Sequence, residues 1–461
     1  MKRKGKRRLR RRVLPPALLA GATLLLLITG PHTLGTPPMD DTYIHLVYGN
    51  SLLSGHPLCY SGSAPSSGFT SPAWLLPASL ASIFGVGFGP MLLMAFSLVI
   101  ACLALWLMQP NAALLLVFSG PFFFHTSSGM ETALASAAVA LAWKWMRDGG
   151  SIRSGSMILA LAFLARPDLA VLIIPMTVSL RERRLSGMAG LAAPSLVAGI
   201  LWVIWNFHAA GRPLPSTFYA KQSVSWLQAA GAGLPGLLKG LLLASPILLF
   251  AAAVSVTAML KQRKKGDDGR GKAGMAAAVI LLFASAFVLQ PNSYFQMRYY
   301  VPALVSAALA AGVWLRGLGG RRRLNTVILV LSMIPGLVVF GGRRVRASTD
   351  VHHIDVLPSE YLLTVAEREE TVAAADIGAV RWITGMEILD LDGLVTPERL
   401  PGGDRAGWPF IRERSDYLLA FPRQYSRLVE DAGEGLVFLA GFGSPSSVIC
   451  GEDSVSLWAV D

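Results

Sequence analysis

Two adjacent acidic residues, Asp40 and Asp41, follow the first long apolar stretch of the chain. A carboxylate at this place can act as a general base for a hydroxyl group, and a neighbouring carboxylate can bind a metal ion or position a substrate. The structural alternative is a helix cap, because residues 42–54 are typical of a short amphipathic helix that ends at Gly55. One aspartate would be enough for a cap, and adjacent like charges repel. Both interpretations stay open.

A second group of ionisable residues lies close to other apolar stretches. Glu131 begins one such stretch, and Arg166-Pro167-Asp168 separates two short ones. Ionisable residues inside apolar surroundings are costly and indicate a functional site, whereas a structural ion pair at a turn is the alternative for Arg166 and Asp168. An acid in the first turn of a helix is also favoured by the helix dipole, which gives Glu131 a structural alternative too.

Three cations complete the candidate chemistry. Arg212 and Lys221 lie in a polar segment, and Arg298 opens an apolar stretch. Arginine holds a phosphate through two parallel hydrogen bonds and lysine holds it as a point charge. We expect these cations to bind an anion, with lipid headgroups as the simplest candidate and a phosphate leaving group as the functional one.

The elements that position these residues are membrane helices. Of the 461 residues, 53% are hydrophobic and 15% charged, with a mean hydropathy of +0.51. Such a composition predicts an α-helical polytopic membrane protein. The net charge of +13 is concentrated in clusters that mark cytoplasmic loops and do not indicate a nucleic-acid partner. These clusters are 2–12, 181–184, 261–265 and 321–323.

Twelve apolar stretches occur, near residues 13–30, 72–86, 89–108, 112–124, 131–146, 155–165, 167–180, 188–207, 233–260, 273–290, 298–316 and 324–341. If all of them crossed the bilayer, residues 147–153 would carry their arginines to the outside. We therefore expect 72–86, which is short and contains two prolines, to lie on the outer leaflet as an interfacial helix. About eleven spans remain, and the first is a retained span and not a signal peptide.

The predicted domains follow from these spans. Residues 1–12 form a basic cytoplasmic N-terminus, 13–342 a transmembrane domain with first outer loop 31–88, and 343–461 a small outer α/β domain. Its expected strands are 371–376, 387–392, 417–421, 436–440 and 457–460, and its expected helices 359–367 and 422–431. The cysteines show no metal-ligand spacing; a disulfide between Cys59 and Cys450 is compatible with this topology, but unpaired thiols are favoured.

Seven short motifs occur in an order that resembles the GT-C superfamily of membrane glycosyltransferases. Within it, the chain is similar to the branch that holds a mycobacterial arabinofuranosyltransferase and a flagellar-motor-control membrane protein. The resemblance covers residues 40 to 395. The motifs are Asp-Asp-Thr-Tyr-Ile (40–44), Gly-Phe-Thr-Ser-Pro-Ala-Trp (68–74), Ser-Gly-Met-Glu-Thr (128–132), Ala-Arg-Pro-Asp (165–168), Pro-Ser-Thr-Phe-Tyr-Ala-Lys (215–221), Arg-Tyr-Tyr-Val-Pro (298–302) and Asp-Ile-Gly-Ala with Asp-Leu-Asp-Gly-Leu (376–394).

The resemblance implies transfer of a sugar, with inversion, from a polyprenyl-phosphate donor to an extracytoplasmic glycan, lipid or protein at the bacterial inner membrane. It also implies that the catalytic base comes from Asp40 or Asp41 in the first outer loop. The expected phosphate ligands are Arg166, Lys221 and Arg298, and the expected substrate-positioning residues are Tyr43, Thr70, Glu131, Asp168 and Tyr219.

No cofactor is required by this mechanism, although a divalent metal held by Asp40, Asp41 and Glu131 is an option. Two other functions stay open: a non-catalytic assembly or regulatory protein, as the flagellar relative suggests, and a transporter of lipid-linked sugars. The transporter is disfavoured because the uncommon charges gather on the outer side alone. The sequence leaves the donor sugar and the acceptor unspecified.

Overall fold

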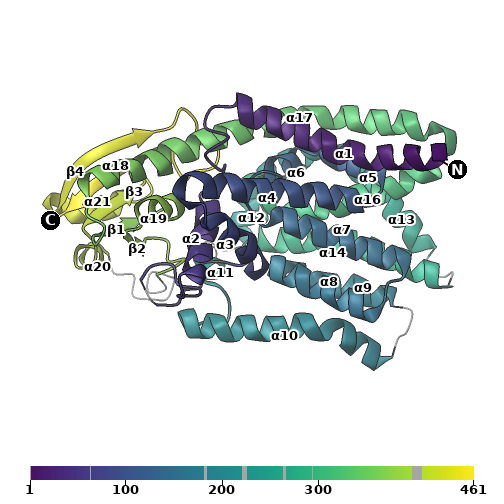
Figure 1. The fold of residues 1–461 in the computed structure, drawn as a ribbon, viewed down its shortest axis with the longest axis horizontal. Coiled ribbons are helices and arrows are strands. Elements are labelled where there is room, and N and C mark those ends of the chain that lie inside the picture. Colours follow the sequence, from purple (N-terminus) through teal and green to yellow (C-terminus); the bar gives the residue numbers. More distant parts are fainter. Residues whose placement is uncertain are drawn as a thin grey trace. The chain divides into compact units, whose positions relative to one another are not determined.

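The computed structural model describes residues 2–62, 64–180, 184–220, 226–262, 266–292, 294–396 and 407–461. The described chain is mostly helical and divides into two compact units (Figure 1). Unit 1 consists of Met1–Leu26, Ala95–Leu201 and Trp226–Gly342. Unit 2 consists of Leu27–Met94, Trp202–Ser225 and Arg343–Asp461. Each unit is therefore assembled from segments that lie far apart in the sequence.

Unit 1 is built from helices that follow the apolar stretches, four of which (α1, α4, α10 and α17) continue into unit 2. They are α1 (Lys2–Thr29), α4 (Gly85–Leu107), α5 (Pro110–Val117), α6 (Gly120–His125), α7 (Thr132–Asp148), α8 (Ile152–Ala165), η2 (Pro167–Leu172), α9 (Ile173–Ser179), α10 (Leu185–Ala210), α12 (Trp226–Ala244), α13 (Pro246–Lys261), α14 (Gly266–Leu289), α15 (Tyr294–Met297), η3 (Arg298–Tyr300), α16 (Val301–Gly317), η4 (Gly319–Arg321) and α17 (Arg322–Val351).

The centre of unit 1 is α16, which packs against α5, α7, α13 and α14. Alanines form much of this contact: Ala307 and Ala310 of α16 and Ala135 and Ala138 of α7 are completely buried. Without a hydrophobic driving force in lipid, small side chains of this kind let helix backbones approach and gain dispersion contacts. The alanine-rich sequence therefore explains the tight central bundle of unit 1.

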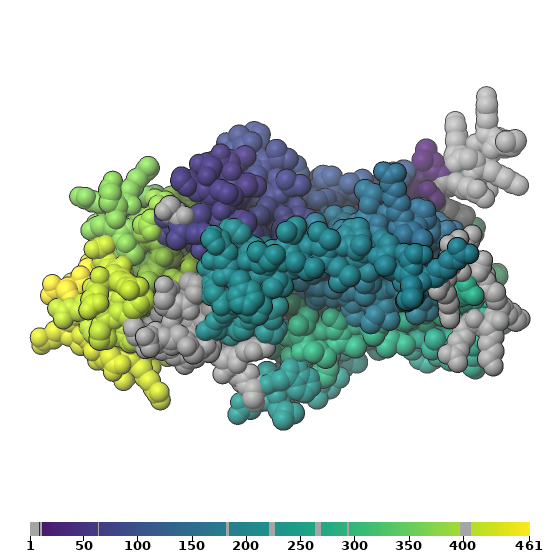
Figure 2. All heavy atoms as spheres, turned by 90° about the horizontal axis from the view of Figure 1, so that it is seen from below, coloured from purple at the N-terminus to yellow at the C-terminus, as the bar shows by residue number. Residues whose placement is uncertain are grey.

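Seven helices of the described residues are long and apolar enough to cross a membrane. The chain is thus a membrane protein, as its composition predicts. Helix α10 illustrates the lipid-facing type, because Leu196, Val197, Ile200 and Leu201 are each more than half exposed. Figure 2 is viewed onto this teal helix and shows it uncovered along its length. Large apolar side chains exposed in this way are stable in hydrocarbon and costly in water.

Two predicted spans are wrong in detail, because each is divided. Residues 112–124 form α5 and α6, with a break at Ser119, and each of these helices begins with a proline in its first turn. Residues 233–260 fall on α12 and α13, separated by Ser245 with φ of +105°. The Ser245 hydroxyl caps α13 by accepting a hydrogen bond from Leu248 N. Composition alone cannot locate such breaks, since the residues on both sides are apolar.

The stretch 72–86, expected to lie on the membrane surface, forms η1 (Pro72–Trp74) and α3 (Leu75–Ser82), and its last residues begin α4. Eight helical residues rise only about 12 Å, too little to cross the roughly 30 Å hydrocarbon core. Leu76, Leu80 and Ile83 are each more than half exposed. A short helix with an exposed apolar face fits the interfacial placement that the charge distribution requires.

Unit 2 combines the first loop with the C-terminal part of the chain. Helix α2 (Asp41–Leu53) packs against α3 and α19 (Gly378–Thr384) (Figure 1). Gly49 of α2 allows the close approach to α3, because a Cβ there would lie 2.6 Å from the backbone of Ala78. The other helical segments are α11 (Ser216–Ala220), η5 (His352–Val356), α18 (Leu357–Val365), α20 (Trp408–Arg412), α21 (Ser426–Ala432) and η7 (Gly433–Gly435).

The C-terminal part of unit 2 contains a five-stranded sheet of order β2-β1-β3-β5-β4. The strands are β1 (Thr371–Ala374), β2 (Glu387–Asp390), β3 (Tyr417–Ala420), β4 (Leu436–Gly443) and β5 (Ser454–Val460). Strand β1 pairs in parallel with β2 and β3, whereas β5 pairs antiparallel with β3 and β4. All five predicted strands and both predicted helices of this domain are confirmed, and α19 and α20 are additional.

The cysteines are unpaired. Cys59, Cys102 and Cys450 are all free thiols, so the favoured alternative from the sequence is the one observed. Cys59 lies in the first loop, and its thiol contacts the carbonyl of Pro57.

Candidate functional site

Asp40 occupies the N-cap position of α2, yet its side chain does not cap that helix. Its carboxylate instead accepts two backbone hydrogen bonds at the start of α19, from Gly378 N to Oδ2 and from Ala379 N to Oδ1, both 2.6 Å long. Asp40 therefore does not cap the helix that the sequence predicted; it binds the start of α19, which lies far along the sequence. An acid is favoured at a helix N-terminus by the dipole and by the unpaired N–H groups.

Gly378 is required by this contact. A Cβ at this position would lie 2.4 Å from the Asp40 carbonyl oxygen and 2.6 Å from its Oδ2. Any side chain would thus push the two segments apart. The sequence Asp-Ile-Gly-Ala at 376–379 keeps room for the carboxylate of the first loop.

Burial raises the pKa of Asp40 from its ordinary 3.8 to about 7, against the lowering effect of the two N–H bonds; the charge of Asp41 raises it further. Asp41 is the first residue of α2 and is half-buried. The two neighbouring acids thus have different surroundings. Both oxygens of Asp40 hold the backbone of α19, while Asp41 stands one position further along on α2.

Further acids gather in the same unit. Burial raises the pKa of Asp376, and repulsion by Asp40, Asp392 and other carboxylates adds to the effect. Asp376 lies two residues after the end of β1, and Asp390 ends β2. Because β1 and β2 are parallel neighbours, their carboxyl ends meet at one edge of the sheet.

Asp390 has a structural role. Its buried carboxylate accepts hydrogen bonds from Asp392 N at 2.9 Å and Val395 N at 2.8 Å, which closes the turn after β2. Burial raises its pKa to about 7, although the Val395 bond opposes this. Residues 387–394 thus form a strand followed by a turn.

The segment around Gly68 is also built into the fold. Gly68 N donates to the hydroxyl of Tyr48, which in turn bonds the hydroxyl of Ser66. A Cβ on Gly68 would lie 2.6 Å from Val395. Ordinary loop packing therefore accounts for this turn, and Thr70, two residues after Gly68, is half-buried.

Two predicted substrate-positioning tyrosines belong to unit 2. Tyr43 of α2 is 3% exposed. Tyr219 of α11 is half-buried, and the guanidinium of Arg212 lies 5.0 Å from its ring centroid. Lys221, predicted to bind phosphate, lies outside the described residues.

Unit 1 brings together four other predicted site residues in two ion pairs. Arg298 donates from Nη2 to both oxygens of Glu131 at 2.8 Å, and both side chains are buried. Arg166 donates from Nε and Nη2 to the two oxygens of Asp168 at 3.0 and 2.9 Å. A third bond, from Arg166 Nη1 to the carbonyl of Arg298 at 3.3 Å, joins the pairs.

Arg166 and Arg298 are therefore both already paired with acids. The Arg166 guanidinium also lies over the ring of Tyr299, 4.7 Å from its centroid, so every part of it has a neighbour. This geometry favours the structural ion pair at the turn as the role of Arg166 and Asp168. Buried ion pairs of this kind specify one arrangement of their helices more than they stabilise it.

An unusual backbone precedes Arg298. Phe295, Gln296 and Met297 have φ of +52°, +53° and +62°, in the left-handed region that non-glycine residues rarely adopt. The ring Nε2 of His125 lies 3.2 Å from the carbonyl of Gln296 and holds this turn. The turn aims Arg298 at Glu131, which no sequence pattern indicated.

Sequence reasoning missed part of the chemistry in unit 2. Asp355 lies on η5 and Cys450 in the connection between β4 and β5, and both lie close to Asp376. The sequence indicates Asp376 only as part of the Asp-Ile-Gly-Ala motif. An acid in the apolar helical stretch before Pro358 could have indicated Asp355, but nothing in the sequence relates it to Cys450.

A pocket of about 340 Å³ also lies in unit 2, lined among others by His56, Tyr60, Arg381 and Trp382. None of the predicted site residues lines it. The Tyr60 hydroxyl donates to the carbonyl of Ile377, beside Asp376.

Comparisons with known proteins address the fold. The model of a domain of unknown function, DUF8728, matches residues 349–457. No curated protein matches the sequence. Among solved structures, ArnT from Cupriavidus metallidurans bound to undecaprenyl phosphate has a TM-score of 0.58 at 10% identity, and its apo state 0.61 at 11% identity. The alignments cover 96% of this chain and 97% of ArnT. The chain described here therefore has an ArnT-like fold.

Proposed function

We propose that this protein is a membrane glycosyltransferase. It moves a sugar from a polyprenyl-phosphate donor to an extracytoplasmic glycan, lipid or protein, with inversion, at the bacterial inner membrane. The observation that carries the proposal is the likeness to ArnT bound to undecaprenyl phosphate over 96% of the chain. The acids at the start of α2 supply the chemistry that such a reaction needs.

We assign the base to Asp41 and an anchoring role to Asp40. The two oxygens of Asp40 accept the N–H groups of Gly378 and Ala379, which fixes its carboxylate to α19. Asp41 stands next to it as the first residue of α2. A general base must be ionised and must reach the acceptor hydroxyl. Burial raises the pKa of Asp40 to about 7 and both of its oxygens accept backbone N–H groups, so Asp40 is the weaker candidate.

The proposed step is a single displacement. The acceptor oxygen forms a bond to the anomeric carbon while the bond from that carbon to the phosphate oxygen breaks. The acceptor proton passes to Asp41, and the polyprenyl phosphate leaves with the electron pair. Phosphate is a good leaving group, so it needs cations to stabilise its charge and no proton.

Arg298, Arg166 and Lys221 are the proposed phosphate ligands, and they differ in their present contacts. Arg298 donates to Glu131 from Nη2, whereas Arg166 donates from Nε and Nη2 to Asp168 and from Nη1 to the carbonyl of Arg298. Tyr43, Thr70 and Tyr219 remain proposed positioning residues, together with Glu131 and Asp168 through their arginine partners.

A bound divalent metal at Asp40, Asp41 and Glu131 is not part of the proposed step. The carboxylates of Asp40 and Glu131 are already engaged, one by backbone N–H groups and the other by Arg298.

The test is donor turnover by the purified full chain in lipid nanodiscs, with a panel of polyprenyl-phosphate sugars. The variants are Asp41→Asn, Asp40→Asn and the double variant. We expect the wild type to consume one donor and Asp41→Asn to lose at least 100-fold in kcat, the usual contribution of a general base. Asp40→Asn should keep most of its turnover and lose thermal stability.

Two results would contradict the proposal. Turnover that survives in Asp41→Asn moves the base elsewhere. A folded wild type that consumes no donor in the panel and binds no polyprenyl phosphate supports a non-catalytic assembly protein.

A further inference from the structure

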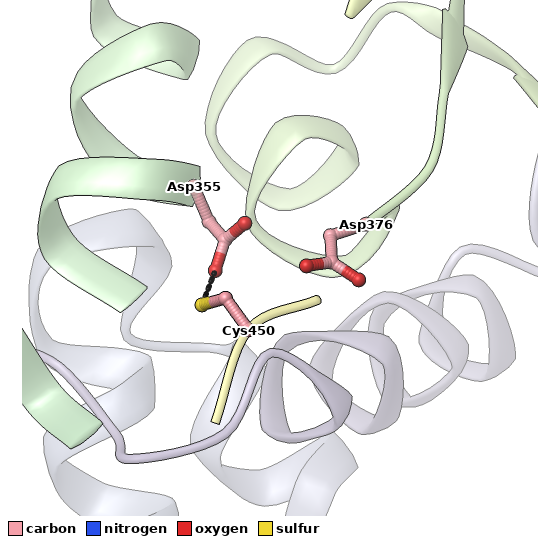
Figure 3. Close-up of side chains that lie close together, drawn as sticks. All are labelled: Asp355, Asp376 and Cys450. Atoms are coloured by element: carbon pink, nitrogen blue, oxygen red, sulfur yellow. Dashed lines mark hydrogen bonds between the residues drawn. The ribbon is translucent and has the colours of Figure 1, made fainter. Parts of the chain in front are cut away.

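Three side chains from distant parts of unit 2 come together in Figure 3. Asp355 lies on η5, Asp376 lies two residues after the end of β1, and Cys450 lies between β4 and β5. One donor atom of each lies within 4.8 Å of the others. The Cys450 thiol donates a weak hydrogen bond to Asp355 Oδ2 at 3.9 Å, and the Asp376 carboxylate faces the same space.

The group carries an excess of negative charge. Asp355 is 4% exposed, and the charges that act on it most strongly belong to Asp376, Asp40 and Asp350. All of these are acids. Asp350 is satisfied separately, since it accepts hydrogen bonds from Ser446 Oγ and Val448 N. A buried carboxylate without a cation is unfavourable, and in proteins such groups are paired or bind metal.

The negative charge of this group extends to a buried tyrosine. Tyr43 is 3% exposed, and the charges that act on its hydroxyl most strongly belong to Asp40 and Asp355. Both of these residues are acids.

We propose that Asp355, Asp376 and Cys450 bind one divalent cation, and that this cation is zinc. Two carboxylates and a thiolate carry three negative charges, and a soft thiolate selects zinc over magnesium or calcium. In a tetrahedral zinc site, ligand atoms lie about 3.5 Å apart, so small side-chain rotations would close the group. The fourth position would hold a water.

The role that follows is structural and does not depend on the proposed sugar transfer. The three ligands join the end of the long helix α17 with η5, the carboxyl end of β1 and the β4–β5 connection. Binding to the folded chain alone stabilises it by RT ln(1 + [Zn²⁺]/Kd). Zinc would thus hold these three segments together in the folded chain.

The test uses the purified full chain in detergent, first treated with chelator and then titrated with Zn²⁺ alone. We expect one zinc per chain by elemental analysis and a thermal midpoint that rises with zinc. With Co²⁺ in place of zinc, we expect a near-ultraviolet charge-transfer band from the thiolate.

Matched variants assign the ligands. Cys450→Ser should abolish the cobalt band and weaken zinc binding at least tenfold, whereas Cys59→Ser and Cys102→Ser should change neither. Asp376→Asn, which leaves the thiol in place, should weaken zinc but keep the band at high Co²⁺. Binding of less than one zinc per folded wild-type chain, or a cobalt band that survives in Cys450→Ser, would overturn the proposal. If Cys450→Ser does not fold, loss of binding in folded Asp376→Asn and Asp355→Asn supports it and full binding in both overturns it.

Discussion

The carboxylate of Asp40 and the backbone N–H of Gly378 form a 2.6 Å hydrogen bond across 338 positions of the sequence. The bond attaches the first loop to the helix that follows β1 of the C-terminal sheet. It turns an acid that looked like a local helix cap into a long-range contact. The conformation of Asp41, the proposed base, depends on this attachment because the two residues are adjacent.

Gly378→Ala should break the attachment. The added Cβ would lie within 2.7 Å of three oxygen atoms of Asp40, which must then move away from α19. We expect a loss of about 1–3 kcal/mol, as for other overpacked sites. Gly35→Ala is the control, since a Cβ there meets nothing within 4 Å. Thermal unfolding of both variants in the same detergent measures the difference, and equal midpoints would refute the attachment.

Protonation of Asp390 should make stability depend on pH. Burial raises the pKa of Asp390 from 3.8 to about 7 in the folded state. Between these values the unfolded chain has lost the proton and the folded chain keeps it. Stability should therefore fall as pH rises from about 4 to about 7, by about 1.4 kcal/mol per pH unit at most, and level off above 7.

Asp390→Asn stays neutral at every pH and removes the contribution of this residue to the pH dependence of the free energy of unfolding. The contribution of Asp40, whose pKa is also about 7, remains. Denaturant unfolding at several pH values measures how steeply the free energy of unfolding changes with pH in the wild type and in the variant. A variant with the same slope as the wild type would show that Asp390 does not titrate in this range.

The sequence predicts those elements whose pattern is local. The five strands of the C-terminal sheet follow short alternating runs, and the helix after Asp41 follows an amphipathic run with a glycine behind it. The interfacial placement of α3 follows from charge counting over the whole chain. For the strands and for this helix, the deciding residues lie within or beside the element.

Long-range partners could not be predicted in this way. The pairing of Glu131 with Arg298 spans 167 positions, and nothing near either residue specifies the other. The left-handed turn at 295–297 contains Phe, Gln and Met, so no glycine in the sequence indicates a left-handed backbone there. It forms because tertiary contacts around Arg298 and His125 outweigh the local preference.

The ion pair of Glu131 and Arg298 should show strong coupling in a double-mutant cycle. Glu131→Gln or Arg298→Met alone leaves one buried charge without its partner, and each should cost about 3 kcal/mol or more. The double variant should lose much less than the sum, because no uncompensated charge remains.

Lys144 and Asp148 provide the matched control for that cycle. Their side chains are 50% and 44% exposed, so the same cycle at this pair should give less than about 1 kcal/mol. Similar coupling energies for the two pairs would mean that solvent reaches Glu131 and Arg298, contrary to their burial.

Gly336 should be essential for the packing of α17 against α12. A Cβ at Gly336 would lie 1.9 Å from the carbonyl oxygen of Leu243, near the break at Ser245, and the Ser245 hydroxyl bonds that of Ser332 on α17. Gly336→Ala must therefore push the helices apart, at about 1–3 kcal/mol. Gly342→Ala lies on the same helix and meets nothing within 4 Å.

The substitutions Gly336→Ala and Gly342→Ala should thus have different effects on stability. Alanine improves helix propensity by about 1 kcal/mol over glycine, so Gly342→Ala should leave stability unchanged or raise it. Thermal unfolding of the two variants in one detergent is the measurement. A Gly336→Ala protein as stable as Gly342→Ala would mean that α12 and α17 do not make this contact, and that the break at Ser245 has another cause.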